Sequence, residues 1–359
     1  MRDRAAVAGI GMTALTRESG RTELELAVEA SRAACADAGI EPGEVDAVLS
    51  YHMNDSAPVV QVASALRIEP LGWHNDITGG GTQAASILGE AAMLIAAGLA
   101  RTVLVYRALN GRSGTRMNTV STGPQERFTV PYGMAGPIPM FALAAQRYLH
   151  ETGLTQEHLH AVVAQSRENA AANPGPCAGT RSLWRTTCPG RTSARRCGPS
   201  TAARRPTARA RWWSGTCGWR PRPPHPHGGA GRRPRLLGHG PRAGRHRDLL
   251  RPPRPLLWER SGMKPGEVDV ALLYDAYSWL VPRQLEDFGL VARAELGEFL
   301  LRRGHAGVNP HGGLLSEGYV HGLNNVAQAV RELRAGRRTA LVTGFGGSYG
   351  SAALLTRGV

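Results

Sequence analysis

The sequence predicts an α/β protein made of two similar halves, stacked as a five-layered α-β-α-β-α sandwich. Its main support is a repeat: residues 38–51 (AGIEPGEVDAVLSY) and 261–274 (SGMKPGEVDVALLY) agree at eight of fourteen positions, with an offset of 223. A second pair, ARTVLVY at 100–106 and RRTALVTG at 337–344, follows at a similar offset, each after an Ala-rich amphipathic stretch. The repeated unit is therefore a whole strand-helix-strand-helix-strand layer, too long for a solenoid module.

The first half alternates between strand and helix patterns. It opens on AVAGIGMT, which predicts a strand and a turn, and the run from Thr22 to Asp37 then predicts a helix. Apolar residues recur at helical spacing on one face of that helix, at Leu24, Ala27, Ala30 and Ala34. Residues 83–99 are apolar nearly all round, so this helix is expected between two layers rather than on a surface.

Each copy of the repeat has the same local signals. A glycine, Gly39 or Gly262, suits the left-handed residue that follows a helix, and a Pro-Gly turn and a short apolar strand come next. The turn is expected to bring Asp46 in one copy and Asp269 in the other to the entrance of a strand.

Residues 107–139 interrupt this pattern. They are rich in Gly, Ser, Thr and Pro, have few periodic apolar residues, and are too numerous for an ordinary connection. We expect an excursion over an active site or a subunit interface. Helices are expected again from Phe141 to His150 and from Gln156 to Asn173.

The chain divides into patterned halves, residues 1–175 and 258–359, around an anomalous Arg/Pro-rich segment, residues 176–257. Between Cys177 and Leu257 there are nineteen Arg, no Lys and one Asp, a local charge of +18 against +15 for the whole chain. The same stretch contains no Val, Ile, Phe, Tyr or Met. It is therefore not expected to form a strand or a core helix.

Three interpretations of this segment compete: an Arg-rich nucleic-acid tail, a disulfide or metal module, and a stretch translated out of frame. A tail belongs at an end of a chain, whereas this segment lies between two globular halves. Its four cysteines contain no CxxC pair, so a zinc site has little support. Its mixture of Arg, Pro, Gly, Ala and Ser is typical of GC-rich DNA read out of frame. We favour a frame-shifted segment and expect no nucleic-acid partner and no metal.

Targeting signals are not apparent in the sequence. The start lacks the basic and apolar regions of a signal peptide, and no stretch approaches about 18 uninterrupted apolar residues. We expect a cytoplasmic protein that does not associate with membranes.

Several motifs fall in an order typical of one superfamily. These are the duplicated halves, the helix-turn-strand motif DAGI-PGEVD, and the glycine-rich run NPHGGLLSEGYVHGLNN at 309–325. Together they resemble the thiolase superfamily, and within it the lipid-transfer-protein or sterol-carrier-protein-x branch. The resemblance covers residues 5–175 and 258–359. It implies the duplicated thiolase fold, acyl-CoA substrates and usually a homodimer, and chains of this branch often pair with a small OB-fold subunit.

The residues of thiolase chemistry are changed at every matching position. Where the family has a nucleophilic Cys at the start of the buried helix of the first half, the chain reads DITGGGTQAAS. The family's NEAF-like element matches the run from Tyr274 to Tyr277, and Tyr319 stands where the catalytic His stands. The last loop, GFGGSYGSA, has no second Cys. This pattern of loss is similar to that of the steroid side-chain-cleaving aldolases, which keep the thiolase fold and break a β-hydroxyacyl-CoA.

A retro-aldol step needs a base for the β-hydroxyl proton and donors for the enolate oxygen, but no covalent nucleophile. Tyr319 is the first candidate for the base or proton shuttle and Tyr277 the second, with Asp275 and His321 able to tune or relay. Candidate backbone donors are Gly79, Gly80, Gly312, Gly313, Gly346 and Gly347. No metal and no tightly bound cofactor are expected, and a coenzyme A thioester is the expected substrate.

Simpler roles compete with these assignments. Tyr277 could pack as an aromatic at the end of a strand, and Asp275 could cap the helix predicted in SWLVPRQLEDFG. His321 could be a solvated loop residue. The glycine run at 79–81 lacks the spacing of a phosphate-binding loop and is better explained as a tight strand-to-helix turn.

The sequence therefore favours an enzyme that cleaves a β-hydroxyacyl-CoA of a sterol side chain or similar lipid by a retro-aldol reaction. An acetyl-CoA acyltransferase of the lipid-transfer type is the alternative, although an acyl-enzyme needs a nucleophile that is absent here. A further alternative is an inactive product of a damaged gene, because a half that loses its first strand is hard to stabilise.

Overall fold

The computed structural model of the chain describes residues 5–16, 19–111, 126–134, 136–173, 215–221, 254–305, 307–345 and 350–358. The elements up to the anomalous segment are β1 (Ala5–Met12), α1 (Glu23–Ala38), η1 (Pro42–Glu44), β2 (Ala47–His52), α2 (Val59–Leu66), β3 (Trp73–Thr78), α3 (Gln83–Ala96), β4 (Val103–Arg107), α4 (Glu126–Thr129), η2 (Val130–Tyr132), α5 (Pro137–Thr152) and α6 (Gln156–Ala172). The remaining elements are β5 (Gly215–Pro221), α7 (Arg254–Ser261), η3 (Pro265–Glu267), β6 (Val270–Leu272), α8 (Leu280–Asp287), η4 (Arg293–Glu295), α9 (Leu296–Leu301), α10 (Gly313–Ser316), α11 (Leu323–Arg334), β7 (Thr339–Phe345) and β8 (Gly350–Thr356).

The described strands form two sheets. The first is five-stranded in the order β1-β5-β4-β2-β3, with β2 parallel to both β3 and β4, and β5 antiparallel to both β1 and β4. The second is three-stranded in the order β6-β7-β8, with β6 parallel and β8 antiparallel to β7. The first sheet thus has three parallel strands beside the antiparallel β5, and the second has two parallel strands beside the antiparallel β8.

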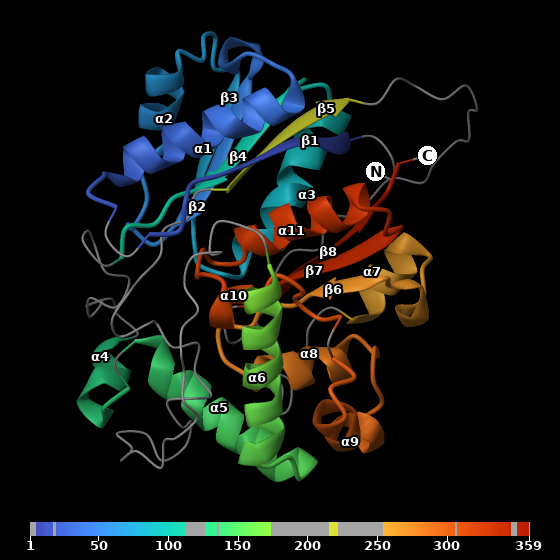
Figure 1. Ribbon diagram of the computed structural model, residues 1–359. Coiled ribbons are helices and arrows are strands. Elements are labelled where there is room, and N and C mark those ends of the chain that lie inside the picture. The colour runs from blue at the N-terminus through green and yellow to red at the C-terminus, as the bar shows by residue number, and fades with distance from the viewer. Residues whose placement is uncertain are drawn as a thin grey trace.

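Three apolar clusters fill the spaces between the layers of helices and sheets, and this layering confirms the five-layered sandwich (Figure 1). On β2, Ala47 and Leu49 face inward and pack with α3 and α11, which lie between the sheets, whereas Val48 faces outward onto α1 and α2. Beyond the second sheet, α5, α6, α8 and α9 make the outer layer. The alternation follows from the period of two along a strand with a helix layer on each face.

The sequence repeat corresponds to a structural repeat. The carboxylate of Asp46 accepts hydrogen bonds from the main-chain N–H groups of Arg101 and Thr102, at 2.8 to 3.1 Å. Asp269 accepts in the same way from Arg338 and Thr339, at 2.6 and 3.2 Å. In both halves the repeated Asp therefore ties the Pro-Gly turn to the start of the next parallel strand.

The helix predictions of the first half are largely confirmed. Thr22 caps α1, and the predicted apolar face is buried except at Leu24, which is only partly covered. The buried helix predicted at 83–99 is α3, which ends at Ala96 and leaves Leu99 exposed. Among the described residues no helix combines the length and apolar character needed to cross a bilayer.

Two expectations about irregular segments are wrong in part. The anomalous segment was expected to form no strand, yet residues 215–221 form β5 between β1 and β4. The backbone N–H and C=O groups of β5 pair with the open edges of β1 and β4, and such pairing does not depend on apolar side chains.

The excursion at 107–139 contains the helical turns α4 and η2, and α5 already begins at Pro137, where proline suits the first turn of a helix. Residues 112–125 and 135 of the excursion lie outside the described residues.

Candidate active site

Two tyrosine hydroxyls meet where the second sheet faces the loop before α11. The hydroxyl oxygen of Tyr274, just after β6, lies 3.0 Å from that of Tyr319, within hydrogen-bond distance. The main chain of Tyr274 is held on both sides, since its N–H donates to Thr343 Oγ1 and its carbonyl accepts from Gln284 Nε2, both at 2.8 Å. Tyr274 is buried, whereas Tyr319 is half-buried in its glycine-rich loop.

The glycine run before α3 lies against this pair. A Cβ added to Gly81 would overlap the ring of Tyr274, so only glycine permits this approach. The turn from β3 to α3 that the sequence predicted is thereby confirmed, and its residues present the positive end of a 14-residue helix to the two phenols. The resemblance placed a Cys nucleophile at this turn. The side chain that lies against the turn is instead the phenol of Tyr274, just after β6.

The environment separates the roles of the two phenols. Burial raises the pKa of Tyr274 well above its usual range, and the nearby Tyr319, Tyr51 and Tyr277 hydroxyls raise it further. Tyr274 therefore stays protonated, and either hydroxyl can donate the hydrogen bond between them. A donated hydrogen bond favours the ionised form of the group that accepts it. When Tyr274 is the donor, its hydrogen bond therefore favours loss of the proton from Tyr319 rather than from Tyr274.

An ion pair lies behind the phenols. Arg107, the last residue of β4, donates from Nη2 to Asp55 Oδ1 at 2.6 Å, and both side chains are almost fully buried. Burial by itself raises the pKa of Asp55, but the Arg107 guanidinium, His321 and the main-chain N–H of Met53 together keep this pKa below its ordinary value. The same Nη2 lies 3.0 Å from Nδ1 of His321.

His321 joins the ion pair to the phenols. Its ring meets the Tyr319 ring edge-on, with centroids 5.1 Å apart, and its carbonyl accepts a hydrogen bond from Tyr51 at 3.0 Å. It is buried and adopts a left-handed backbone, φ 51°. The expectation of a merely solvated loop residue is therefore wrong for His321.

Asp275 lies close to the phenols in the sequence but faces another way. Its carboxylate accepts from the main-chain N–H groups of Leu314 and Leu315, at 2.8 and 3.4 Å, at the start of α10. The expected cap on the helix in SWLVPRQLEDFG is wrong, because α8 begins only at Leu280. Burial raises the pKa of Asp275 to about 7, although the two amides oppose this.

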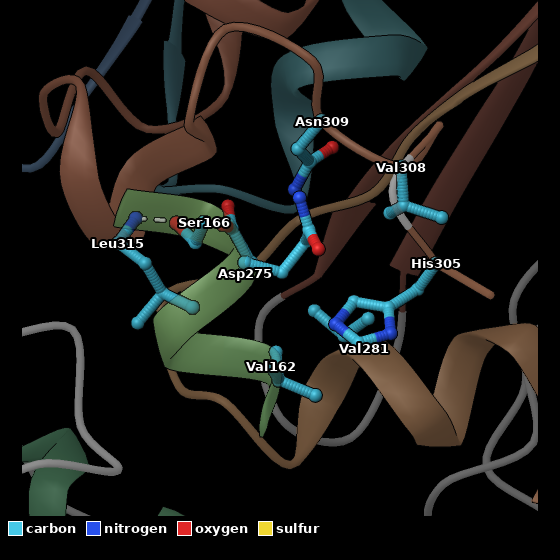
Figure 2. A pocket seen from close by; sticks show the side chains of 9 residues that line it. Val162, Ser166, Asp275, Val281, His305, Val308, Asn309 and Leu315 are labelled. Atoms are coloured by element: carbon cyan, nitrogen blue, oxygen red, sulfur yellow. Dashed lines mark hydrogen bonds between the residues drawn. The ribbon is translucent and has the colours of Figure 1, made fainter. Parts of the chain in front are cut away.

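Asp275 lines a small cavity that is separate from the tyrosine pair (Figure 2). His305, Asn309 and Ser166 lie around the same cavity, in which valine side chains complete the wall. Its volume is about 10 Å³, room for about one water molecule and far below the roughly 300 to 1,000 Å³ of ordinary ligand sites. We therefore locate the chemistry at the phenols and assign Asp275 a role in holding α10.

Tyr277 packs in the apolar cluster below the second sheet. Its ring stacks on Phe141, with centroids 4.6 Å apart and an interplanar angle of 28°. Only about a tenth of it is exposed. This arrangement favours the packing role over proton transfer, although its hydroxyl contributes to the raised pKa of Tyr274.

The predicted backbone donors fall into four groups. The N–H groups of Gly79 and Gly312 already donate to main-chain carbonyls, of His52 at 3.0 Å and of Asn309 at 2.8 Å. Gly313 has the Asp275 carboxylate against its Cα. Gly80 alone faces His321, whose Nε2 would lie 3.7 Å from a Cβ added there. Gly346 and Gly347 lie outside the described residues.

The sequence interpretation missed Tyr274, Tyr51, Arg107 and Asp55. Two of these had a signal, since Tyr51 and Tyr274 are the last matching position of the repeat and both end at the carboxyl edge of a parallel strand. Arg107 and Asp55 had none, because an Arg at a strand end and an Asp in a loop are ordinary surface residues in a sequence. No group of three or more possible metal ligands occurs among the described residues.

Comparison with known proteins gives a consistent result. The family described as Thiolase C-terminal domain-like matches residues 257–356. A steroid side-chain-cleaving aldolase of Thermomonospora curvata is 33% identical over 92% of this chain and 90% of its own length. A 17-hydroxy-3-oxo-4-pregnene-20-carboxyl-CoA lyase of Mycobacterium tuberculosis is 32% identical, covering 92% and 91% of the two chains. The solved Ltp2-ChsH2(DUF35) aldolase superposes with a TM-score of 0.80 at 29% identity, over 99% of this chain and 98% of that one.

Proposed function

Because the chain belongs to the steroid side-chain-cleaving aldolases of the thiolase superfamily, we propose that it breaks the Cα–Cβ bond of a β-hydroxyacyl-CoA by retro-aldol cleavage. The observation that carries this proposal is the phenol pair, with Tyr274 and Tyr319 hydroxyl oxygens 3.0 Å apart at the N-terminus of α3. This site offers proton transfer and oxyanion stabilisation, which are the two requirements of the reaction.

The steps follow from the assigned roles. Ionised Tyr319, stabilised by the hydrogen bond from Tyr274, takes the proton of the β-hydroxyl group. The C–O bond becomes a carbonyl, the Cα–Cβ bond breaks, and its electron pair forms the enolate of the shortened thioester. The Tyr319 proton then passes to Cα, which yields a ketone and a shorter acyl-CoA and restores the phenolate.

Acyltransfer through a thiol has no support at this site. Cys35, a free cysteine, lies buried in α1, where burial raises the pKa of its thiol to about 11. A thiol with that pKa is a poor nucleophile near neutrality. Covalent trapping of an acyl-enzyme would nevertheless revive the acyltransferase alternative.

The finer attributes are proposals of the same kind. We expect a CoA thioester with a sterol side chain as substrate and no tightly bound cofactor, since the retro-aldol reaction is redox-neutral and needs only proton transfer and oxyanion stabilisation. A partner subunit is supported by the similar aldolase structure, which is named for two components, and its small size and OB fold stay predictions. A homodimer and a cytoplasmic location stay predictions.

The test is direct. The protein, alone and co-expressed with a small OB-fold subunit, is incubated with a β-hydroxyacyl-CoA that has a tertiary hydroxyl on a steroid side chain. We expect equal amounts of a ketone and a shortened acyl-CoA. Quantitative recovery of the substrate with both preparations would contradict the proposal.

A further inference from the structure

The buried pair of Arg107 and Asp55 calls for a role beyond stability. Arg107 is fully buried and Asp55 2% exposed, and Arg107 Nε and Asp55 Oδ2 have no hydrogen-bond partner within the described part of the chain. Burying an ion pair costs solvation that mutual attraction often only balances, so such a pair is a weak means of stabilising a fold. Arg107 also donates from Nη1 to the carbonyl of Ala108 at 3.0 Å, and its Nη2 reaches His321 beside the phenols.

That contact fixes the state of the imidazole. Guanidinium groups donate hydrogen bonds and cannot accept them, so the 3.0 Å contact requires Nδ1 of His321 to be the acceptor. A proton on Nδ1 would point at the N–H of Arg107. His321 is therefore neutral with its proton on Nε2, which makes it a donor and removes it as a base.

The donor faces the site of chemistry. A Cβ added to Gly80 would lie 3.7 Å from Nε2 and 3.8 Å from Cε1 of His321, so this edge of the ring faces the turn before α3. The other charged or titratable groups around His321 are Tyr319, Tyr51 and Asp55. A substrate oxygen bound between this turn and Tyr319 would accept a hydrogen bond from Nε2–H and would lie at the positive end of α3.

We propose that His321 donates its Nε2–H to the thioester oxygen as it becomes the enolate oxygen, and that Arg107 and Asp55 are positioning residues that hold the donor tautomer. The inference rests on the proposed retro-aldol function and assigns its oxyanion donor. As the Cα–Cβ bond breaks, its electron pair moves into the enolate and negative charge gathers on that oxygen. The proton stays on Nε2 throughout, so the step needs no further acid.

The first measurement does not depend on activity. In protein labelled with ¹⁵N-histidine, the His321 signals are identified by their loss in His321→Gln. We expect the shifts of a neutral Nε2–H tautomer from pH 6 to pH 9. In Arg107→Gln, where the Nδ1 partner is gone, we expect titration within that range. An imidazolium or Nδ1–H tautomer in the unaltered protein would overturn the proposal.

The second measurement is kinetic. We expect His321→Leu to lower kcat by roughly 10² to 10³-fold with little change in KM, as for loss of an oxyanion donor. His321→Gln, which keeps an N–H near the Nε2 position, should recover at least about tenfold of that loss, whereas equal kcat values for the two variants would contradict the assignment.

A matched ion pair provides the control. Arg283 pairs with Asp287 at 2.5 Å and lies 5.6 Å from the Tyr148 ring centroid, much as Arg107 lies 5.6 Å from that of Tyr51. Arg107→Gln should lower kcat at least about tenfold and Arg283→Gln should leave it unchanged; equal losses would reduce Arg107 to a structural role. Failure of the unaltered protein to cleave any β-hydroxyacyl-CoA would instead contradict the proposed function and leave the tautomer result to stand by itself.

Discussion

Tyr51 and Tyr274 occupy the same position in the two halves and do different work. Tyr51 lies at the end of β2 and donates to the carbonyl of His321, before α11 of the other half. Tyr274 lies after β6 against Gly81, before α3 of the other half, and its hydroxyl meets a second phenol. Each half thus packs a repeated tyrosine onto the start of the other half's central helix. One copy holds a loop in place and the other is available for chemistry.

The halves also differ at the next strand. Arg107 at the end of β4 corresponds to Gly344 in β7. The arginine reaches His321, whereas a Cβ at Gly344 would overlap the carbonyl of Gly81. The two halves therefore share one backbone arrangement and differ at this matching position. Arg107 places a buried cation on one side of the site, and Gly344 leaves space for the turn before α3 on the other.

The two sheets differ in size, with five described strands in the first and three in the second. The largest effect on stability is expected from the cause of this difference. In the first sheet β5 lies between β4 and β1, whereas β8 pairs with β7 alone among the described strands. If residues 176–257 are read out of frame, sequencing of the gene across codons 174 to 258 should find two compensating shifts. The corrected chain should supply a first strand for the second half and raise Tm by roughly 5 °C or more, as expected for several kcal/mol.

If sequencing finds no frame shift, the difference between the two sheets is a property of the protein itself. Residues 215–221 would then be a native strand of the first sheet, and deletion of 222–253 would be the informative control. A Tm unchanged by that deletion would contradict an essential role for the Arg-rich segment.

Tyr319 to Phe should have the largest effect of any single substitution. It removes the proposed base while retaining the ring, so we expect kcat to fall between roughly 10² and 10⁴-fold, with KM changed less than about threefold. Steady-state kinetics on the β-hydroxyacyl-CoA measures both. Turnover equal to that of the unaltered protein would exclude Tyr319 as the base.

The repeated tyrosines themselves give the sharpest comparison. Tyr274→Phe removes the donor to Tyr319, and we expect kcat to fall roughly 10²-fold. Tyr51→Phe leaves the buried His321 carbonyl without its donor, so unfolding free energy should fall by about 1–3 kcal/mol while kcat changes less than tenfold. Denaturant titration and kinetics on both variants distinguish the roles. The comparison fails if the two variants show the same profile.

The repeat made the fold predictable but only part of the site. The eight matching positions of the repeat showed that the two halves have the same order of strands and helices. The absence of the family's catalytic Cys and His residues then directed attention to Tyr319. Tyr277 was preferred to Tyr274 because the two are three residues apart and the sequence does not show which side of the chain faces the loop at 319. The ion pair was unpredictable for a similar reason, because Arg107 and Asp55 meet only after β2 and β4 pair.

A pH effect on stability should distinguish the second half. Burial raises the pKa of Asp275 to about 7 and also that of Glu317 to about 7, while both groups have ordinary values when unfolded. The folded state therefore keeps these protons as pH rises from about 4 to 7, where the unfolded chain has lost them. Stability is fully present below about pH 4 and is lost toward pH 7, by about 1.4 kcal/mol per pH unit for each group.

Asp275→Asn tests this contribution. Asparagine retains an acceptor for the Leu314 N–H but has no proton to lose, so the variant should gain stability relative to the unaltered protein as pH rises from 4 to 7. Unfolding titrations at several pH values measure the difference, and Glu317→Gln, measured beside it, should show a gain in the same pH range. Parallel curves for Asp275→Asn and the unaltered protein would show that Asp275 does not titrate in this range.

The smallest effect is expected at Tyr277. Its ring stacks on Phe141 inside an apolar cluster, and Tyr277→Phe preserves that contact. Since its hydroxyl contributes less to the raised pKa of Tyr274 than burial and the hydroxyls of Tyr319 and Tyr51 do, kcat should stay within about twofold and unfolding free energy within about 1 kcal/mol. A loss of kcat as large as that of Tyr274→Phe would reverse the assignment of the second phenol. It would mean that the loop carrying Tyr319 turns toward Phe141 when substrate binds, so that the pairing of Tyr274 with Tyr319 belongs only to the resting enzyme.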